Sequence, residues 1–209
     1  MEIGVNQGET FLGVNASRKV AVDPKFLFDV DYAKTREPHS EFHETTSDDY
    51  FASIDVGRER FSVVFIDGLH TFEQTLRDFT NAIHLIQDDG IIVIDDVIPS
   101  TYQASLPNQS DAFIIKAFTQ SNDNSWMGDT FKLVYFIHSF FPTYELRTIS
   151  DNHGQAVVWK AAYVRSGFHE YSILDLANLE FLDVVKRTAE YSKAPFADIV
   201  AELSTCRAR

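Results

Sequence analysis

Four side chains that could bind a cation or transfer a proton come shortly after two strongly apolar runs. Asp67 and His70 follow the run FSVVFI, and the pair Asp95–Asp96 follows the run IIVI. Runs this apolar are typical of buried parallel strands, whose carboxyl ends meet at the edge of an open α/β sheet where ligands bind. Because neighbouring strands lie about 4.8 Å apart, we expect the carboxylates and the imidazole to converge at that edge.

Converging carboxylates predict a cation. They repel one another unless a proton or a positive ion neutralises them. A set of oxygen ligands without cysteine suits Mg²⁺, Mn²⁺ or Ca²⁺, so Asp67, Asp95 and Asp96 are the predicted metal ligands. The alternative is that these acids only cap helices or face solvent.

His70 is the candidate catalytic base. A neutral imidazole over this edge could accept a proton from a substrate hydroxyl, because its pKa lies near the working pH. The alternative is that His70 simply precedes Thr71, the cap of the next helix. The other six histidines have no comparable setting in the sequence.

The first ten residues, MEIGVNQGET, contain a second chemical signal. A short strand that runs into a glycine turn and then a helix is the nucleoside-binding corner of doubly wound folds. Gly4 and Gly8 would let the backbone turn sharply and approach a ligand closely. Asn6, where a third glycine is common, tolerates a left-handed conformation. The alternative is that these residues form an ordinary turn between a strand and a helix and bind no ligand.

A carboxylate follows at the distance that ribose recognition requires. Asp23 ends the apolar stretch KVAVD, nineteen residues after Gly4 and near the roughly twenty-residue offset of ribose-binding acids. Asp23 is therefore predicted to bind ribose, although an exposed acid at a strand end is the alternative. Glu9, in the first turn of the next helix, would repel a pyrophosphate. This favours S-adenosylmethionine, which has ribose and adenine but no phosphate, over NAD.

Composition narrows the class of protein. With 18 basic and 31 acidic residues among 209, the net charge of −13 argues against a nonspecific nucleic-acid surface or attraction to anionic lipid. Cys206 is the only cysteine, so one chain can form neither a disulfide nor a cysteine zinc site. The sequence has no apolar run near the roughly twenty residues of a membrane span and no signal peptide, so we expect a cytoplasmic protein.

The order of elements predicts one α/β domain over residues 1–164 and a helical extension over 165–209. The chain opens directly on its central strand, so we expect a missing N-terminal segment or another segment that covers this strand. Ser47 is a candidate helix cap, and Gln74 completes a predicted capping box with Thr71. The expected strands are 19–23, 41–46, 61–67, 91–96, 144–149 and 155–160, and the expected helices are 10–18, 71–86, 113–118 and 130–140, the last capped by Gly128 and Asp129.

The segments EIGVNQGET, VAVDP, TTSDDYF, VVFIDGLHTFEQTLRDF and GIIVIDDV together resemble the class I S-adenosylmethionine-dependent methyltransferases over about residues 1–160. More narrowly, they resemble the branch with a D-G-x-H element, which includes sugar and macrolide O-methyltransferases. The resemblance implies a doubly wound, Rossmann-like sheet of seven strands in the order 3-2-1-4-5-7-6. In that sheet the last strand is antiparallel, and helices cover both faces.

The resemblance also implies roles for individual residues. In the first ten residues, called the glycine corner below, Glu2, Gly4 and Gly8 would line the methionine end of the cofactor. Asp23 would contact ribose, and Ser47 would flank adenine. In metal-using relatives, the matching acids bind magnesium and the histidine matching His70 acts as base. The segment Trp126–Asp129 with Lys132 is similar to an element beside the acceptor pocket. The cofactor-binding residues implied in this way are Glu2, Gly4, Asn6, Gly8, Asp23, Ser47 and Asp67.

The implied reaction is O-methylation of a hydroxyl group on a small molecule or sugar, with Mg²⁺ or Mn²⁺ as an aid. The hydroxyl would lose its proton to His70 and attack the sulfonium methyl in line. An NAD-dependent oxidoreductase would share the glycine corner and Asp23, but Glu9 and the terminal hairpin count against it. A catalytically idle member of the fold that binds a partner through its tail would need no acidic edge. The sequence leaves a homo-oligomer open.

Overall fold

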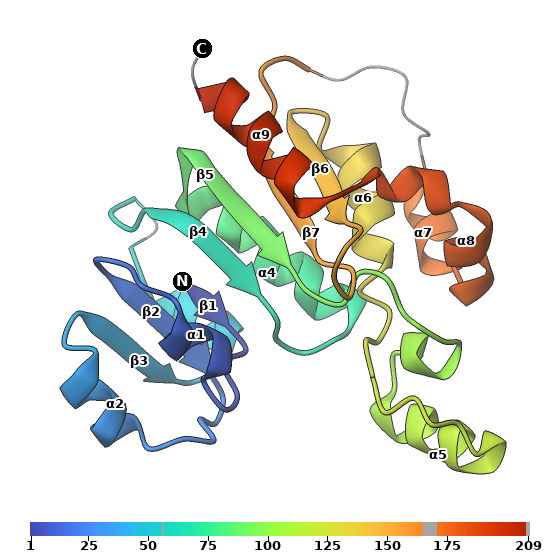
Figure 1. The fold of residues 1–209 in the computed structure, drawn as a ribbon, viewed down its shortest axis with the longest axis horizontal. Coiled ribbons are helices and arrows are strands. Elements are labelled where there is room, and N and C mark those ends of the chain that lie inside the picture. The colour runs from blue at the N-terminus through green and yellow to red at the C-terminus, as the bar shows by residue number, and fades with distance from the viewer. Residues whose placement is uncertain (56, 165–170, 208–209) are drawn as a thin grey trace.

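The computed structural model describes residues 1–55, 57–164 and 171–207. Over these residues the chain forms a mixed eight-stranded sheet in the order β3-β2-β1-β4-β5-β7-β6-β8 (Figure 1). Strand β7 is antiparallel to both of its neighbours, and the other neighbouring pairs are parallel. The predicted order of seven strands is therefore confirmed, and β8 adds an eighth strand at the edge beside β6.

The strands are β1 (Glu2–Ile3), β2 (Lys19–Asp23), β3 (Ser40–Glu44), β4 (Phe61–Ile66), β5 (Ile86–Ile94), β6 (Tyr144–Ile149), β7 (Ala156–Lys160) and β8 (Lys193–Ala194). The α-helices are α1 (Glu9–Gly13), α2 (Val30–Arg36), α3 (Ser47–Ser53), α4 (Phe72–Leu85), α5 (Gln109–Thr119), α6 (Lys132–Phe140), α7 (Ile173–Ala177), α8 (Phe181–Lys186) and α9 (Phe196–Arg207). Two short 3₁₀ helices are η1 (Gln103–Ser105) and η2 (Thr188–Tyr191).

The alternation of side chains along the strands divides the core into two layers. In β2, Val20 and Val22 face the large cluster formed with α3, α4 and α6, whereas Ala21 faces Phe11 of α1 on the opposite side. Successive strand residues point to opposite faces, so a strand covered by helices on both sides must be apolar throughout. Figure 1 shows α4 and α6 behind the sheet, with α1 and α9 in front of it.

Several element boundaries differ from the predictions. Strand β5 begins at Ile86 rather than at residue 91, because the stretch QDDG, which reads as a turn, continues in extended conformation. The register with β4 shifts there: Phe61 pairs with Ile86, but Val63 pairs with Ile91. The extra residues on β5 form an irregularity of the kind that a bulge produces.

Two helices are also corrected. The predicted loop 25–40 contains α2, because the Asp29 side chain accepts a hydrogen bond from the Tyr32 amide and starts a helix there. The predicted helix 10–18 ends at Gly13. Helix α5 is longer than predicted because Asn108 caps it several residues earlier, by accepting from the amides of Ser110 and Asp111.

The C-terminal segment packs on the sheet with its own small core. Ile199 of α9 is buried against Trp159 of β7, and Tyr191 is fully buried in the main cluster. Residues 165–170 lie outside the described residues, so the predicted division at 164 and 165 stays a prediction. Among the described residues, every helix is too short or too polar to cross a bilayer.

Candidate functional site

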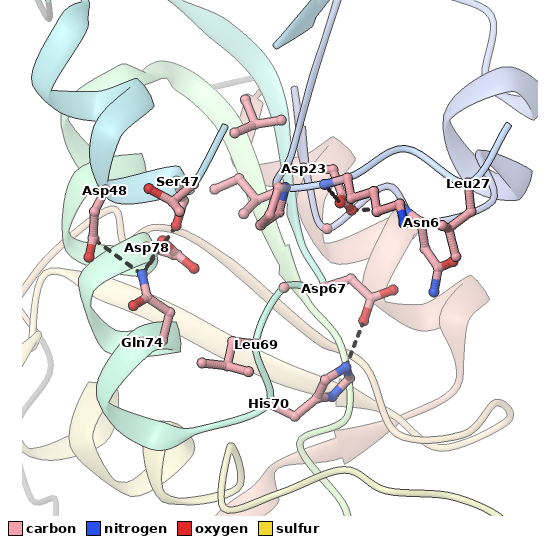
Figure 2. Close-up of a pocket in the computed structure, with 17 residues that line it drawn as sticks. Asn6, Asp23, Leu27, Ser47, Asp48, Asp67, Leu69, His70, Gln74 and Asp78 are labelled. Atoms are coloured by element: carbon pink, nitrogen blue, oxygen red, sulfur yellow. Dashed lines mark hydrogen bonds and ion pairs between the residues drawn. The ribbon is translucent and has the colours of Figure 1, made fainter. Parts of the chain in front are cut away.

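A cavity of about 610 Å³ opens at the carboxyl edge of β1, β2 and β4, where ligands bind in open α/β sheets (Figure 2). A smaller cavity of about 210 Å³ adjoins it, since both are lined by Gly4, Asn6 and Asp67. Glu2 and Glu9 line the smaller one. Gly8 lines neither cavity. The predicted residues that line the larger cavity are Gly4, Asn6, Asp23, Ser47, Asp67 and His70.

The glycine corner has the predicted backbone but a different reason for its first glycine. Gly4 and Asn6 both have positive φ, at 83° and 49°, so the left-handed asparagine is confirmed. A Cβ on Gly4 would lie 1.9 Å from the carbonyl oxygen of Asp67. Gly4 is therefore needed first because the end of β1 touches the chain after β4 there. Gly8, with φ of 78°, begins α1 against the ring of Phe28.

Asp23 ties the glycine corner to the end of β2. Its Oδ2 accepts hydrogen bonds from the amides of Val5 and Asn6, both at 2.8 Å, and its Oδ1 accepts from the amide of Lys25 at 2.7 Å. The residue is only 9% exposed. Since each carboxylate oxygen has two lone pairs, the side chain keeps acceptor capacity toward the cavity. Its ribose contact stays a prediction.

At the far end of the cavity, Ser47 belongs to a polar network with Gln74 and Asp78, two residues for which the sequence predicts no role in the cavity. The Gln74 amide of α4 donates to Ser47 Oγ at 3.1 Å and to the carboxylates of Asp48 and Asp78, both at 3.2 Å (Figure 2). Asp78 is 1% exposed, and this burial raises its pKa. The available signal was two polar residues four positions apart on one side of an amphipathic helix.

Two predicted helix caps are corrected by these contacts. The Thr71 hydroxyl accepts from the Gln74 amide as expected, but the Gln74 side chain points into the cavity instead of back to residue 71. Helix α3 is capped by Thr46, whose hydroxyl accepts from the amide of Asp49 at 3.1 Å. Ser47 is the first residue inside the helix. Its hydroxyl is therefore available to the cavity network.

The acids at the edge are arranged as two carboxylate–imidazole pairs. His70 Nδ1 lies 2.8 Å from Asp96 Oδ2, and its Nε2 lies 3.8 Å from Asp67 Oδ1. On the other side, His153 Nε2 lies 2.8 Å from Asp95 Oδ1. The statement that no other histidine has a setting like that of His70 is therefore wrong. His153 escaped sequence reasoning because it comes from the distant turn between β6 and β7.

The backbone separates these two pairs. Asp96 has a positive φ of 57°, which is uncommon for a residue other than glycine and is a form of strain found at functional sites. Its amide donates to Asp95 Oδ1 at 2.9 Å. The two neighbouring acids are thus turned toward different histidines.

Burial governs the charges at this edge. Burial and, to a smaller extent, the nearby negative charge of Asp95 together raise the pKa of Asp67 to about 8, while the charge of His70 acts in the opposite direction. For His70, burial lowers the pKa, but the hydrogen bond and charge of Asp96 and the charge of Asp67 outweigh it, so that the pKa is raised overall. Burial also raises the pKa of Glu2, to about 7.

The donor set fits a divalent cation, with imidazole added to the predicted oxygens. Asp67, His70 and Asp96 each offer a ligand atom within 4.8 Å of the others, and so do Asp95, Asp96 and His153. The three predicted acids thus fall into two groups that share Asp96. Mixed carboxylate and imidazole donors suit Mn²⁺ and other first-row ions better than Ca²⁺. Metal binding by these residues stays a prediction.

The segment after α5 closes the site beside His70. The Trp126 ring lies 5.3 Å from the His70 ring, and a Cβ on Gly128 would lie 1.5 Å from the His70 carbonyl oxygen. Asp129 accepts a hydrogen bond from the amide of Phe72 at 2.7 Å. The prediction that Asp129 caps α6 is therefore wrong, because its side chain binds the first amide of α4 and fixes the loop that holds His70.

The fold and the position of its cavity are those of a known class of protein. A doubly wound sheet in which an antiparallel strand inserts between β5 and β6, with a nucleoside-sized cavity at the corner after β1, is the architecture of the class I methyltransferases. Residues 1–97 match the family model described as a methyltransferase domain. The chain thus resembles the class I S-adenosylmethionine-dependent methyltransferases. No curated protein sequence matches the chain significantly.

Solved structures support the same fold. The O-methyltransferase TomG from Streptomyces achromogenes, involved in tomaymycin synthesis and solved in complex with SAM, is 15% identical with a TM-score of 0.50. The match covers 77% of this chain and 72% of that one. Cofactor-bound Rv0187 from MTB is 18% identical with the same TM-score, over 79% of this chain and 72% of that one. At these identities the likeness concerns the fold.

Proposed function

We propose that the protein is a cytoplasmic methyltransferase that transfers a methyl group from S-adenosylmethionine to a hydroxyl group of a small molecule or sugar. The observation that carries this proposal is the junction of two features. A cavity large enough for a nucleoside cofactor ends at Asp67 and His70, and the same two residues belong to the carboxylate–imidazole cluster. A methyl donor in the cavity would therefore lie next to a group that can accept a proton.

The charge of the cavity favours S-adenosylmethionine over NAD. Its lining includes the carboxylates of Asp23 and Asp48 and two acids whose pKa is raised by burial, Asp67 and Asp78, against a single lysine, Lys25. Such a lining attracts the positive sulfonium and ammonium groups of S-adenosylmethionine and repels a pyrophosphate. Glu9 at the start of α1 adds to this effect, because it occupies the helix end where a pyrophosphate would dock.

The reaction needs a hydroxyl oxygen in line with the sulfonium methyl and a base for its proton. Asp96 holds Nδ1 of His70, so Nε2 faces the site on the side of Asp67. As the new C–O bond forms and the S–CH₃ bond breaks, the proton of the hydroxyl passes to this nitrogen. A divalent cation, when bound by the acids, would lower the pKa of the acceptor hydroxyl. Neutralisation of Asp67 and Asp96 would also bring the pKa of His70 down, which frees the imidazole as a base.

The first test is calorimetry with S-adenosylmethionine, S-adenosylhomocysteine and NAD. We expect the first two to bind and NAD not to bind. Asp23→Ala should weaken S-adenosylmethionine binding by about 1–3 kcal/mol, the scale of a lost charged hydrogen bond. Asp31→Ala is the control, because the Asp31 side chain on α2 is 95% exposed. Since Asp23 also holds the glycine corner, Asp23→Asn, which keeps one acceptor oxygen, checks that any loss is not caused by misfolding.

Three outcomes separate the alternatives. Unchanged affinity in a folded Asp23→Ala variant would refute the ribose contact. Binding of NAD in preference to S-adenosylmethionine would favour an oxidoreductase. Binding of S-adenosylmethionine without formation of S-adenosylhomocysteine from any member of a panel of phenols, sugars and glycosides would favour the catalytically idle member of the fold.

A further inference from the structure

His153 reaches the site by a route that follows from the topology. Strand β7 is antiparallel to β5, and its first residue, Ala156, pairs with Ile94 at the end of β5. The turn that precedes β7 is therefore placed directly beside Asp95 at the carboxyl edge, although the two side chains are 58 residues apart in sequence. A parallel strand in this place would have put its carboxyl end there instead.

The turn that carries His153 is held in place on both sides. The Asn152 side chain accepts hydrogen bonds from the amides of Gly154 and Gln155, at 2.8 and 3.3 Å. Gly154 has a φ of 100°, and a Cβ there would lie 2.8 Å from the Cβ of Ile98, just after the acids. The Val97 amide donates to the Gly154 carbonyl. This turn and the segment after Asp96 are thus packed as one unit.

The contact between His153 and Asp95 has a defined direction. An ionised carboxylate can only accept a hydrogen bond, so Nε2 of His153 is the donor in the 2.8 Å contact. The Asp95 side chain is 13% exposed, whereas the His153 side chain is 56% exposed. The same Oδ1 also accepts from the Asp96 amide. The Asp95 carboxylate is therefore held by two donors, which are the exposed imidazole of His153 and the backbone amide of Asp96.

We propose that His153 is a positioning residue of the cation site: its hydrogen bond fixes the Asp95 carboxylate beside Asp96 for a divalent ion such as Mn²⁺. This inference rests on the proposed function, because it deepens the role of the acidic edge. Ligands that are held by a hydrogen-bond partner of this kind typically lose about 10- to 100-fold in metal affinity when that partner is removed. The acid that His153 holds is one of the three predicted ligands.

The test is Mn²⁺ binding to the full chain, measured as the loss of the free Mn²⁺ electron paramagnetic resonance signal and by calorimetry. His153→Ala should raise the dissociation constant for Mn²⁺ by about 10- to 100-fold. His153→Gln should stay within a few-fold of wild type, because its amide nitrogen can donate from nearly the position of Nε2. His153→Asn, which is too short to reach Asp95, should behave like the alanine variant. His39→Ala, at an exposed histidine before β3, is the matched control.

The outcomes are separable. If His153→Ala binds Mn²⁺ like wild type, the inference is overturned and the metal remains. If His153→Gln is as weak as His153→Ala, the imidazole itself is required, and the positioning role is overturned. A wild-type chain that does not bind Mn²⁺ overturns both this inference and the metal part of the proposed function. Titration with S-adenosylmethionine, which all variants should bind equally, tests the methyltransferase assignment separately.

Discussion

Different partners stabilise the buried acidic side chains on the two sides of the carboxyl edge. On the cofactor side, Asp23 accepts three backbone hydrogen bonds from the glycine corner and from its own turn. On the side where we propose that the reaction takes place, called the reaction side, Asp67, Asp95 and Asp96 face imidazoles and one another. Backbone amides are neutral donors that do not titrate. On the cofactor side the chain itself therefore stabilises the buried carboxylate. On the reaction side, the negative charge of the acids is neutralised by a proton or a cation, and either of these can bind and leave.

This difference indicates a division of labour. A carboxylate that is fixed by backbone amides is suited to hold a part of the ligand that does not react. A group of acids whose charge is balanced by His70 and His153 is suited to the step in which a proton is transferred. Apart from Asp67, which also lines the cofactor cavity, changes on the reaction side should therefore affect rate and cation binding and leave cofactor affinity unchanged, and changes on the cofactor side should do the reverse.

The largest expected effect comes from removing the base. His70→Ala should slow formation of S-adenosylhomocysteine by about two to four powers of ten, because the acceptor hydroxyl then loses its proton without help. Affinity for S-adenosylmethionine should change little. The rate is measured with the acceptor that gives the highest turnover in the panel, and affinity by calorimetry. His39→Ala is the control, and a His70→Ala enzyme of normal rate would refute the base assignment.

Gly128 tests how firmly the reaction side is closed. It has a positive φ of 59°, and a Cβ there would overlap the backbone of His70. Gly128→Ala should lower the free energy of unfolding by about 2–4 kcal/mol, since backbone strain and a backbone clash add. Gly13→Ala, at the end of α1 with open space around its Cβ, should change stability by less than about 1 kcal/mol. Urea denaturation measures both, and equal effects would contradict the close packing on His70.

Most of the sheet could be predicted from the sequence because its signals are local. An apolar run such as FSVVFI indicates a strand whatever its register, so strands β2, β4 and the hairpin of β6 and β7 lie within a few residues of the prediction. The errors occur where tertiary contacts decide. The stretch QDDG has the composition of a turn, yet it pairs beside β4 through an irregular register. Asp129 looks like the cap of the helix that follows it, but it caps α4 instead.

The residues of the site also fall into those that local sequence signals predict and those that only tertiary contacts bring together. Asp67, His70, Asp95 and Asp96 follow strand ends directly, so topology alone predicts where they lie. His153 and Gln74 could not be found, because each meets its partners only after distant segments come together. No spacing marks a turn histidine, and the spacing of Gln74 from Thr71 indicates a capping box and not a place in the cavity. The close approach of Gly4 to Asp67 likewise depends on the pairing of β1 with β4.

Proton competition should make cation binding depend on pH. Burial and the charge of Asp95 raise the pKa of Asp67 to about 8, and only the ionised carboxylate binds a metal. The dissociation constant for Mn²⁺ should therefore fall by about tenfold per pH unit as pH rises from 6 to 8, and level off above 8. Calorimetry at each pH measures it, and Asp67→Asn should flatten the profile.

The raised pKa of Asp67 should also make the stability of the metal-free fold depend on pH, but in the opposite direction from Mn²⁺ affinity. The unfolded chain releases the proton of Asp67 near the ordinary pKa of 3.8, whereas the folded chain keeps it to about 8. Stability should therefore fall as pH rises through this range, because the unfolded state binds fewer protons. Saturating Mn²⁺ should offset the loss at pH 8. A metal-free stability that rises toward pH 8, and does so equally in Asp67→Asn, would contradict the burial of this acid.

The smallest expected effects separate structure from binding on the cofactor side. Thr46 caps α3, whereas its neighbour Ser47 lies inside the helix and accepts the hydrogen bond of Gln74 at the cavity. Thr46→Ala should cost about 1 kcal/mol of unfolding free energy, the usual value for a lost cap, without a matching loss of S-adenosylmethionine affinity. Ser47→Ala should do the reverse, weakening the cofactor by about 0.5–1.5 kcal/mol with little change in stability. Because the two substitutions are adjacent and remove the same type of group, urea denaturation and calorimetry on this pair compare the two roles directly. If Ser47→Ala destabilised the fold and left affinity intact, Ser47 would have no part in the adenine end of the cavity, and the cofactor side would have to be placed elsewhere along this edge.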